Sequence, residues 1–70
     1  MDDKVIVVKD GYTFNYSDGR CTGSIGNIAL GESFEIIIRK IGSQYHCSCM
    51  ISGVYIQIWC TEYRIEKITY

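Results

Sequence analysis

Residues 44–60 read QYHCSCMISGVYIQIWC, and they contain three of the four cysteines and the only histidine of the chain. Two interpretations compete for this stretch: a metal or redox site, or a β-hairpin that uses cysteine as a small apolar residue. Residues 45–51 and 54–60 are rich in β-branched and aromatic residues, and Ser52-Gly53 separates them as a two-residue turn. The stretch therefore predicts a hairpin with a defined register.

A further strand over residues 34–41, followed by a turn at Gly42-Ser43, extends this hairpin to a three-stranded meander. The two turns alone place the residues of the three strands in cross-strand rows. The rows of one face contain only apolar residues and cysteine: Ile36, Cys49 and Ile56; Ile38, Cys47 and Ile58; Phe34, Ile51 and Val54. Because a slip of one residue would mix the two faces, this agreement supports the register.

The register places Cys47 and Cys49 on the core face, whereas His46 points to the opposite face. These three side chains do not converge on one metal ion, so we expect the cysteines to pack as small hydrophobic residues. Two alternatives stay open. One is a zinc ion bound by Cys21, Cys47, Cys49 and Cys60, and the other is a disulfide between Cys21 and Cys60.

The opposite face of the meander is a candidate binding surface. Its rows are Arg39, His46 and Trp59; Ile37, Ser48 and Gln57; and Glu35, Met50 and Tyr55. Trp, Tyr, Met and Arg are residue types that are enriched at protein interfaces. The alternative is that the N-terminal strand or the glycine-rich segment 23–31 folds over this face and makes it a second core.

The rest of the chain also predicts strands, because no segment has a helical period of apolar residues. A short apolar strand is expected over residues 4–9. Residues 12–16 alternate aromatic and polar side chains, as in a half-buried strand. Residues 23–31 are rich in glycine, and we expect them to be irregular, within a long and flexible excursion loop.

Asp18-Gly19 predicts a tight turn after the second strand, since Asp-Gly is a preferred pair in two-residue hairpins. This turn would place Tyr16 opposite Cys21 and Phe14 opposite Gly23. An aromatic ring that covers a glycine is a favourable cross-strand pair, so we expect a hairpin at this position.

The order of these elements resembles the layout of SH3-like barrels, which have a first strand, a long RT-type loop, a diverging turn, three meander strands, a 3₁₀ turn and a last short strand. Residues 28–37, IALGESFEII, are similar to the SH3 segment in which a leucine precedes a Gly-Glu turn and an apolar strand. Residues 61–65, TEYRI, lie where SH3 domains have their Ser-Asn-Tyr-Val turn, and Tyr63 is the counterpart of a peptide-groove residue.

The resemblance implies a single all-β domain over residues 1–70, a small SH3-like barrel of about five strands with a long first excursion loop. The alternative architectures are an OB-like barrel and a sheet that completes itself by dimerisation.

The composition limits the class of function. Seventy residues with a net charge of -1 and no block of like charge do not favour a nucleic-acid binder that neutralises phosphates. No signal peptide is visible, and the apolar run over residues 5–8 is too short to span a membrane. We therefore expect a cytoplasmic protein that does not bind membranes.

No catalytic set of residues is apparent in the sequence. Ser48 shares the face of His46, but no pattern places a carboxylate to orient the imidazole. The glycine-rich residues 19–26 lack the Gly-Lys-Ser/Thr of a phosphate-binding loop. We expect no enzymatic activity, no cofactor and no bound metal.

We therefore expect a small non-enzymatic intracellular module that binds another protein, as an inhibitor, adaptor or regulatory subunit. Regulators encoded by phages and mobile elements often have this profile. The aromatic face and the excursion loop would dock, and the binding residues expected are Arg39, His46, Met50, Tyr55, Trp59 and Tyr63. A homodimer through the Trp59 face is a close variant. The alternative is a single-stranded nucleic-acid binder that stacks bases on the same aromatic residues.

Overall fold

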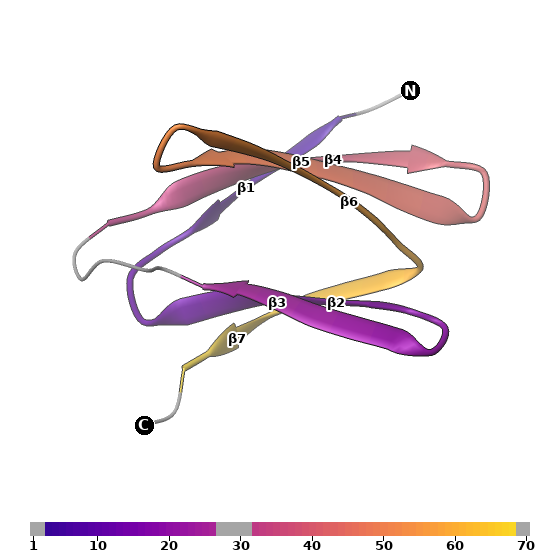
Figure 1. Cartoon of the computed structure of the whole chain (residues 1–70), viewed down its shortest axis with the longest axis horizontal. Helices are drawn as coiled ribbons and strands as arrows, with labels where there is room; N and C mark the ends of the chain where they lie inside the picture. The colour runs from indigo at the N-terminus through magenta and orange to yellow at the C-terminus, as the bar shows by residue number, and fades with distance from the viewer. Residues whose placement is uncertain (1–2, 27–31, 69–70) are drawn as a thin grey trace.

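The computed structural model describes residues 3–26 and 32–68, and it confirms the all-β prediction. The strands of these residues are β1 (Lys4–Val8), β2 (Tyr12–Asp18), β3 (Cys21–Gly26), β4 (Phe34–Ile41), β5 (Gln44–Ile51), β6 (Val54–Cys60) and β7 (Glu62–Lys67). They form a four-stranded antiparallel sheet in the order β1-β4-β5-β6 and a three-stranded antiparallel sheet in the order β3-β2-β7. Figure 1 shows the two sheets as stacked layers.

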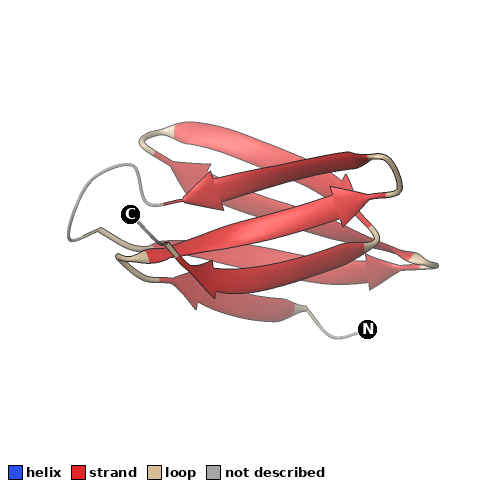
Figure 2. Ribbon diagram, turned by 90° about the horizontal axis from the view of Figure 1, so that it is seen from below, coloured by secondary structure: helices blue, strands red, loops and turns tan. Residues whose placement is uncertain are grey.

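Seen from below, the described chain consists of strands, turns and short loops (Figure 2). Within residues 3–26 and 32–68, no strand pairing joins the two sheets, so the described strands do not close into a barrel. There are also seven of them rather than about five. Nowhere in these residues is there a helix of the length and hydropathy that crossing a membrane requires.

The predicted register of the meander is confirmed. Rows of β4, β5 and β6 pair Ile36 with Cys49 and Cys49 with Ile56, and they pair Ile38 with Cys47 and Cys47 with Ile58. Phe34, predicted to lie beside Ile51, pairs with Val8 of β1.

The two predicted turns explain this register. Ser52 and Gly53 both have positive φ, 51° and 78°, as a type I′ hairpin turn requires. Gly42 has a φ of 62° at the first position of the other turn, where a type II′ turn needs glycine.

The hydrophobic core lies between the sheets and comes mainly from the inner face of the four-stranded sheet. Its buried residues are Val8, Phe14, Phe34, Ile36, Ile38, Cys47, Cys49 and Cys60. Phe14 is the buried member from the three-stranded sheet, and its ring lies 6.2 Å from that of Tyr16 and 5.6 Å from that of Tyr63. Fully burying a side chain such as Phe14 or Ile36 contributes about 1.5–3 kcal/mol.

The β2–β3 hairpin differs from the prediction by a shift of its turn. The turn residues are Gly19 and Arg20, not Asp18 and Gly19, and Asp18 pairs with Cys21. Gly19 has a φ of 61°, so a type II′ turn with glycine first replaces the expected Asp-Gly turn. The ring that covers Gly23 is therefore that of Tyr16, not that of Phe14.

Two further expectations from the SH3 layout are wrong in the described residues. The flexible excursion loop is an ordered hairpin as far as Gly26, and the expected 3₁₀ turn is the strand β7. β7 forms because Tyr63 and Ile65 alternate with charged residues and pair with Tyr16 and Phe14 of β2. Residues 27–31, which include part of the SH3-like segment, lie outside the described residues.

We predict that Gly23→Ala destabilises the protein. A Cβ atom at this position would overlap the ring of Tyr16, so the free energy of unfolding should fall by about 1–3 kcal/mol, the usual cost of overpacking. Urea denaturation followed by circular dichroism measures this loss. Ser24→Ala is the matched control, since Ser24 is exposed on the same strand, and it should change stability by less than about 0.5 kcal/mol. Equal stability of the two variants would contradict the packing of Tyr16 on Gly23.

Candidate functional site

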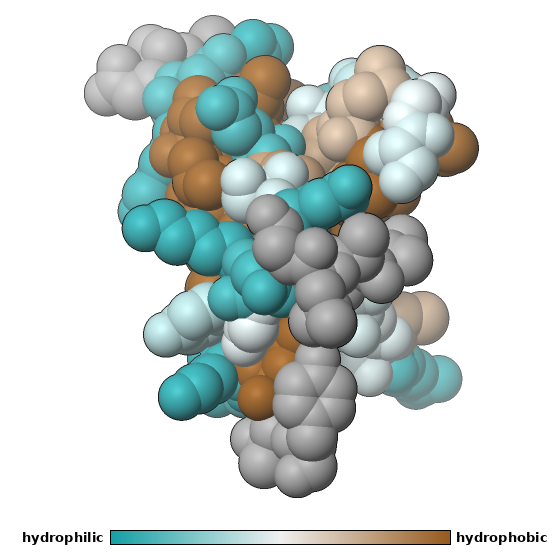
Figure 3. Space-filling view, turned by 90° about the vertical axis from the view of Figure 1, so that its left-hand side faces the viewer, coloured by the Kyte–Doolittle hydropathy of each residue, from teal (hydrophilic) through white to brown (hydrophobic). Residues whose placement is uncertain are grey.

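The outer face of the four-stranded sheet, turned away from the three-stranded sheet, has most of the exposed large hydrophobic side chains. These side chains are Val5, Val7, Ile37, Ile41, Met50, Tyr55 and Trp59. Met50 is 58% exposed, Tyr55 56% and Trp59 48%. Figure 3 looks at the molecule from one end, and hydrophobic surface reaches the solvent in the upper half, where the four-stranded sheet lies.

Successive side chains of β4, β5 and β6 point alternately to the two faces of the sheet, and this alternation produces the outer face. Since the rows with Cys47 and Cys49 face the core, the rows between them must face outward. Arg39, His46 and Trp59 form one outward row, as predicted, and Met50 pairs with Tyr55 in another.

His46 and Trp59 make an aromatic pair at one end of the outer face. Their ring centroids lie 4.7 Å apart with the planes inclined at 49°. The Nε2 atom of His46 lies 3.2 Å from Oε1 of Gln57, and it donates a hydrogen bond when it carries the proton. The imidazole thus contacts both the amide of Gln57 and the indole of Trp59.

The other end of the outer face is hollowed. A depression of about 490 Å³ is lined mainly by Val7, Ile37, Met50 and Tyr55, and Glu35 and Ser48 also border it. Methionine is flexible and polarisable, so Met50 can adapt its shape to an inserted side chain.

Arg39 of β4 forms a bidentate ion pair with Asp3, the residue before β1. Its Nε and Nη2 atoms lie 2.9 and 3.1 Å from the two carboxylate oxygens. The hydrogen bond to Arg39 lowers the pKa of Asp3, and the same bond raises the pKa of Arg39. Both groups are exposed, so the pair adds little stability, but it neutralises the charge of Arg39.

The structure brings together five of the six residues expected to bind: Arg39, His46, Met50, Tyr55 and Trp59. It separates Tyr63 from them. Tyr63 is on β7 in the other sheet, and its partly buried ring stacks on Phe14 and meets the edge of Tyr45 at 5.2 Å. Tyr63 is therefore part of the packing between the sheets.

Among residues 3–26 and 32–68, no strand covers the outer face in the way that a second core would require. Residues 27–31 of the glycine-rich segment lie outside the described residues. β1 lies beside β4 in the same sheet, with Val5 opposite Ile37, and so it widens the face instead of covering it. Gly23 and Gly26 belong to β3 in the other layer.

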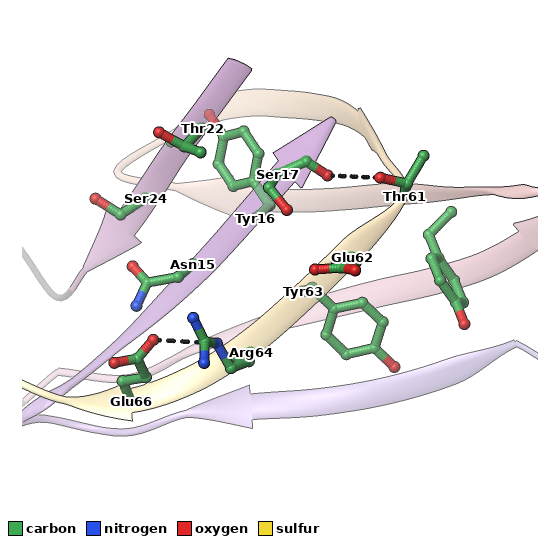
Figure 4. Close-up of a pocket in the computed structure, with 12 residues that line it drawn as sticks. Asn15, Tyr16, Ser17, Thr22, Ser24, Thr61, Glu62, Tyr63, Arg64 and Glu66 are labelled. Carbon is green, nitrogen blue, oxygen red and sulfur yellow. Dashed lines mark hydrogen bonds and ion pairs between the residues drawn. The ribbon is translucent and has the colours of Figure 1, made fainter. Parts of the chain in front are cut away.

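A polar groove of about 970 Å³ on the three-stranded sheet was not expected. Figure 4 shows its polar side chains, with hydrogen bonding between Thr61 and the carbonyl of Ser17 at 3.2 Å and an ion pair between Arg64 and Glu66 at 3.4 Å. The alternation of polar residues along β2 and β7 could have predicted this face. None of the described polar or charged residues is buried, so the groove lacks the desolvated polar groups of a built ligand site.

Three of the four cysteines are core residues. Cys47, Cys49 and Cys60 are buried free thiols, and Cys21 is an exposed one. The sulfur of Cys60 lies 3.8 Å from that of Cys47, far longer than a disulfide bond of about 2.05 Å. Burial raises the pKa of Cys47 to about 12, with the neighbouring Cys60 as a further cause.

Burial also raises the pKa of the Cys49 and Cys60 thiols. These groups therefore stay protonated at neutral pH, which disfavours nucleophilic attack. In the described ranges, no three His, Cys, Asp or Glu residues are grouped in a way that could hold a metal ion.

The outer face is the strongest candidate site because it combines exposed aromatic rings, an apolar hollow and a neutralised cation on one rigid sheet. The chain matches no protein-family model, and neither a curated protein nor a solved structure is significantly similar to it.

We predict that one thiol reacts much faster than the others. In the native protein iodoacetamide should modify Cys21 within minutes, while Cys47, Cys49 and Cys60 react only after unfolding, because they are buried and protonated. Intact mass spectrometry over time measures the number of added groups. Rapid labelling of several cysteines in the folded protein would contradict the inward-facing rows.

We also predict that stability falls at alkaline pH. Below the ordinary thiol pKa of about 8.5 both states keep the Cys47 proton, whereas above it only the unfolded chain releases that proton. The free energy of unfolding should then fall by up to about 1.4 kcal/mol per pH unit for this thiol, until the pH reaches the folded pKa. Urea denaturation from about pH 7 to 10 measures the slope.

Cys47→Ala should reduce this slope, and Ser24→Ala, which removes no ionisable group, should leave it unchanged. Equal slopes for the wild type and Cys47→Ala would show that the Cys47 thiol does not stay protonated in the folded state.

Proposed function

We propose that the protein is a small non-enzymatic module that binds another protein through the outer face of its four-stranded sheet. The observation that supports this most is the exposure of Trp59, Tyr55 and Met50 on one continuous face. Such residues dominate the binding energy of protein interfaces, and exposed apolar patches of this kind mark interaction sites. An inhibitor, an adaptor or a regulatory subunit would act in this way, without chemistry of its own.

The contrast between the two outer surfaces supports the same proposal. The outward residues of the three-stranded sheet are polar or charged, and they include Asn15, Ser17, Glu62 and Arg64. A stable sandwich needs no hydrophobic groups on its outward faces, since its core already lies between the sheets. The exposed apolar residues on the outer face of the four-stranded sheet therefore support a role in binding.

A photo-crosslinking experiment tests the proposal. p-Benzoylphenylalanine replaces Tyr55 on the outer face or, as a matched control, Asn15 on the polar face, and each protein is irradiated in the cells that make it. We expect one defined protein adduct from position 55 and none from position 15. The partner found in this way is then purified for binding measurements.

We predict that Trp59→Ala weakens binding to this partner by about 2 kcal/mol, or roughly 30-fold, as for a central aromatic anchor. Isothermal titration calorimetry measures the affinity, and Asn15→Ala serves as the control that should retain it. Unchanged affinity for Trp59→Ala, or an adduct only from position 15, would mean that partners bind elsewhere.

Single-stranded nucleic-acid binding is the second candidate, and the His46–Trp59 pair could stack bases. The ion pair with Asp3 weighs against it, because the guanidinium of Arg39 is already neutralised. We expect no salt-dependent change in the fluorescence anisotropy of a labelled oligonucleotide. Binding that falls with salt and is lost in an Arg39→Glu, Lys40→Glu variant would favour nucleic acid instead.

The predictions of an SH3-like fold, of a cytoplasmic location and of an origin in a phage or mobile element are also part of this proposal. The element order, with a first strand, a hairpin excursion, a three-stranded meander and a last strand, fits an SH3-like module. A cytoplasmic location, and an origin in a phage or a mobile element, would suit a small regulator.

A further inference from the structure

In the part of the chain that the structure describes, β6 is an edge strand of the four-stranded sheet. Within residues 3–26 and 32–68, β5 is the one strand that pairs with it, and Figure 1 shows β6 at the front of the upper layer. Its sequence, VYIQIWC, contains no charged residue, no proline and no glycine. Proteins usually protect such an edge with charges, proline or bulges, because an open edge pairs with other strands.

The other edge strands differ from β6 in this respect. β7, with the sequence EYRIEK, has Glu62, Arg64, Glu66 and Lys67 along its length. β3 is interrupted by two glycines, and β1 is short and begins with a lysine. β6 is therefore the edge that is best suited to pair with another strand.

The hairpin turn determines which main-chain groups of β6 are free. In a hairpin closed by a two-residue turn, the pair next to the turn is hydrogen-bonded, and bonded and non-bonded pairs then alternate. Ile51 and Val54 flank the turn, so every second residue from Val54 binds β5. The N–H and C=O groups of Tyr55, Gln57 and Trp59 consequently point to the open edge.

The side chains of β6 are self-complementary about Gln57. Moving outward from Gln57 in both directions, the strand has Ile56 and Ile58, then Tyr55 and Trp59, then Val54 and Cys60. A second β6, antiparallel and centred on the same residue, would place isoleucine opposite isoleucine and tyrosine opposite tryptophan. Cross-strand pairs of like apolar or aromatic side chains are favourable.

This arrangement also satisfies the free main-chain groups. With Gln57 opposite Gln57 of the second copy, Tyr55 lies opposite Trp59 of the second copy. These are the residues whose N–H and C=O groups face the open edge, so about six hydrogen bonds would form across the junction. A register shifted by one residue would bring together groups already bound to β5.

We infer that two copies of this chain associate through antiparallel pairing of their β6 strands, with a two-fold axis at Gln57. The contact is isologous, as in most homodimers, and it joins the two four-stranded sheets into one continuous sheet. Both outer faces then lie on the same side, and Tyr55 and Trp59 of each copy form a single aromatic surface. The dimer goes beyond the proposed function, because it requires no other protein.

Sedimentation equilibrium of the wild type and of Gln57→Lys tests the inference. The substitution places two ammonium groups opposite each other at the axis, where like charges repel. We expect a wild-type dimer, and a dissociation constant raised by about two- to fivefold in Gln57→Lys. Thr22→Lys adds the same charge to the exposed edge strand β3, and as the matched control it should leave the dimer intact.

A charge-swap experiment distinguishes weaker association from a folding defect caused by the substitution. Gln57→Lys and Gln57→Glu should each dimerise more weakly than the wild type, and their mixture should associate more tightly than either variant alone, through a Lys–Glu pair at the axis. A monomeric wild type, a Gln57→Lys protein as dimeric as the wild type, or a mixture that associates no better than the separate variants would each overturn the inference.

Discussion

The two tight turns that join β4, β5 and β6 are the constraint on which the rest of the structure depends. Gly42, Ser52 and Gly53 adopt positive φ, and two-residue turns of this kind allow one register only. That register turns the cysteines inward and Trp59 outward. A slip of β4 or of β5 by one residue would bury Arg39 or His46 respectively, and desolvation of that side chain would be unfavourable.

The four-stranded sheet has hydrophobic residues on both of its faces, whereas a β-sandwich needs them only on the face that packs against the other sheet. Seventy residues bury only a small core, and the described part of that core comes mostly from the inner face of the meander. The outer face of the same sheet is also apolar, whereas the three-stranded sheet is polar outside and charged along β7. The features suited to recognition, which are the aromatic face and the uncharged β6 edge, therefore lie on the same sheet.

The meander could be predicted from the sequence because glycine positions and strand alternation independently gave one register. The β2–β3 hairpin could not, since Asp18-Gly19 and Gly19-Arg20 are both acceptable turns, and packing of Tyr16 on Gly23 distinguishes them. Five of the six expected binding residues followed from alternation and share the outer face. Tyr63 was predicted to bind because of the resemblance to SH3 domains. A resemblance in the order of elements does not determine which face of the sheet a residue of this chain occupies.

Cross-strand nuclear Overhauser effects test the register of the meander most directly. Pairs that are not hydrogen-bonded bring their Hα atoms closest, and the turns assign Ile38–Cys47 and His46–Trp59 to this class. The structure predicts strong Hα–Hα effects within both pairs. Strong effects displaced by one residue, such as Ile37 with Cys47, would contradict the register, and the cysteine core and the aromatic outer face would be wrong with it.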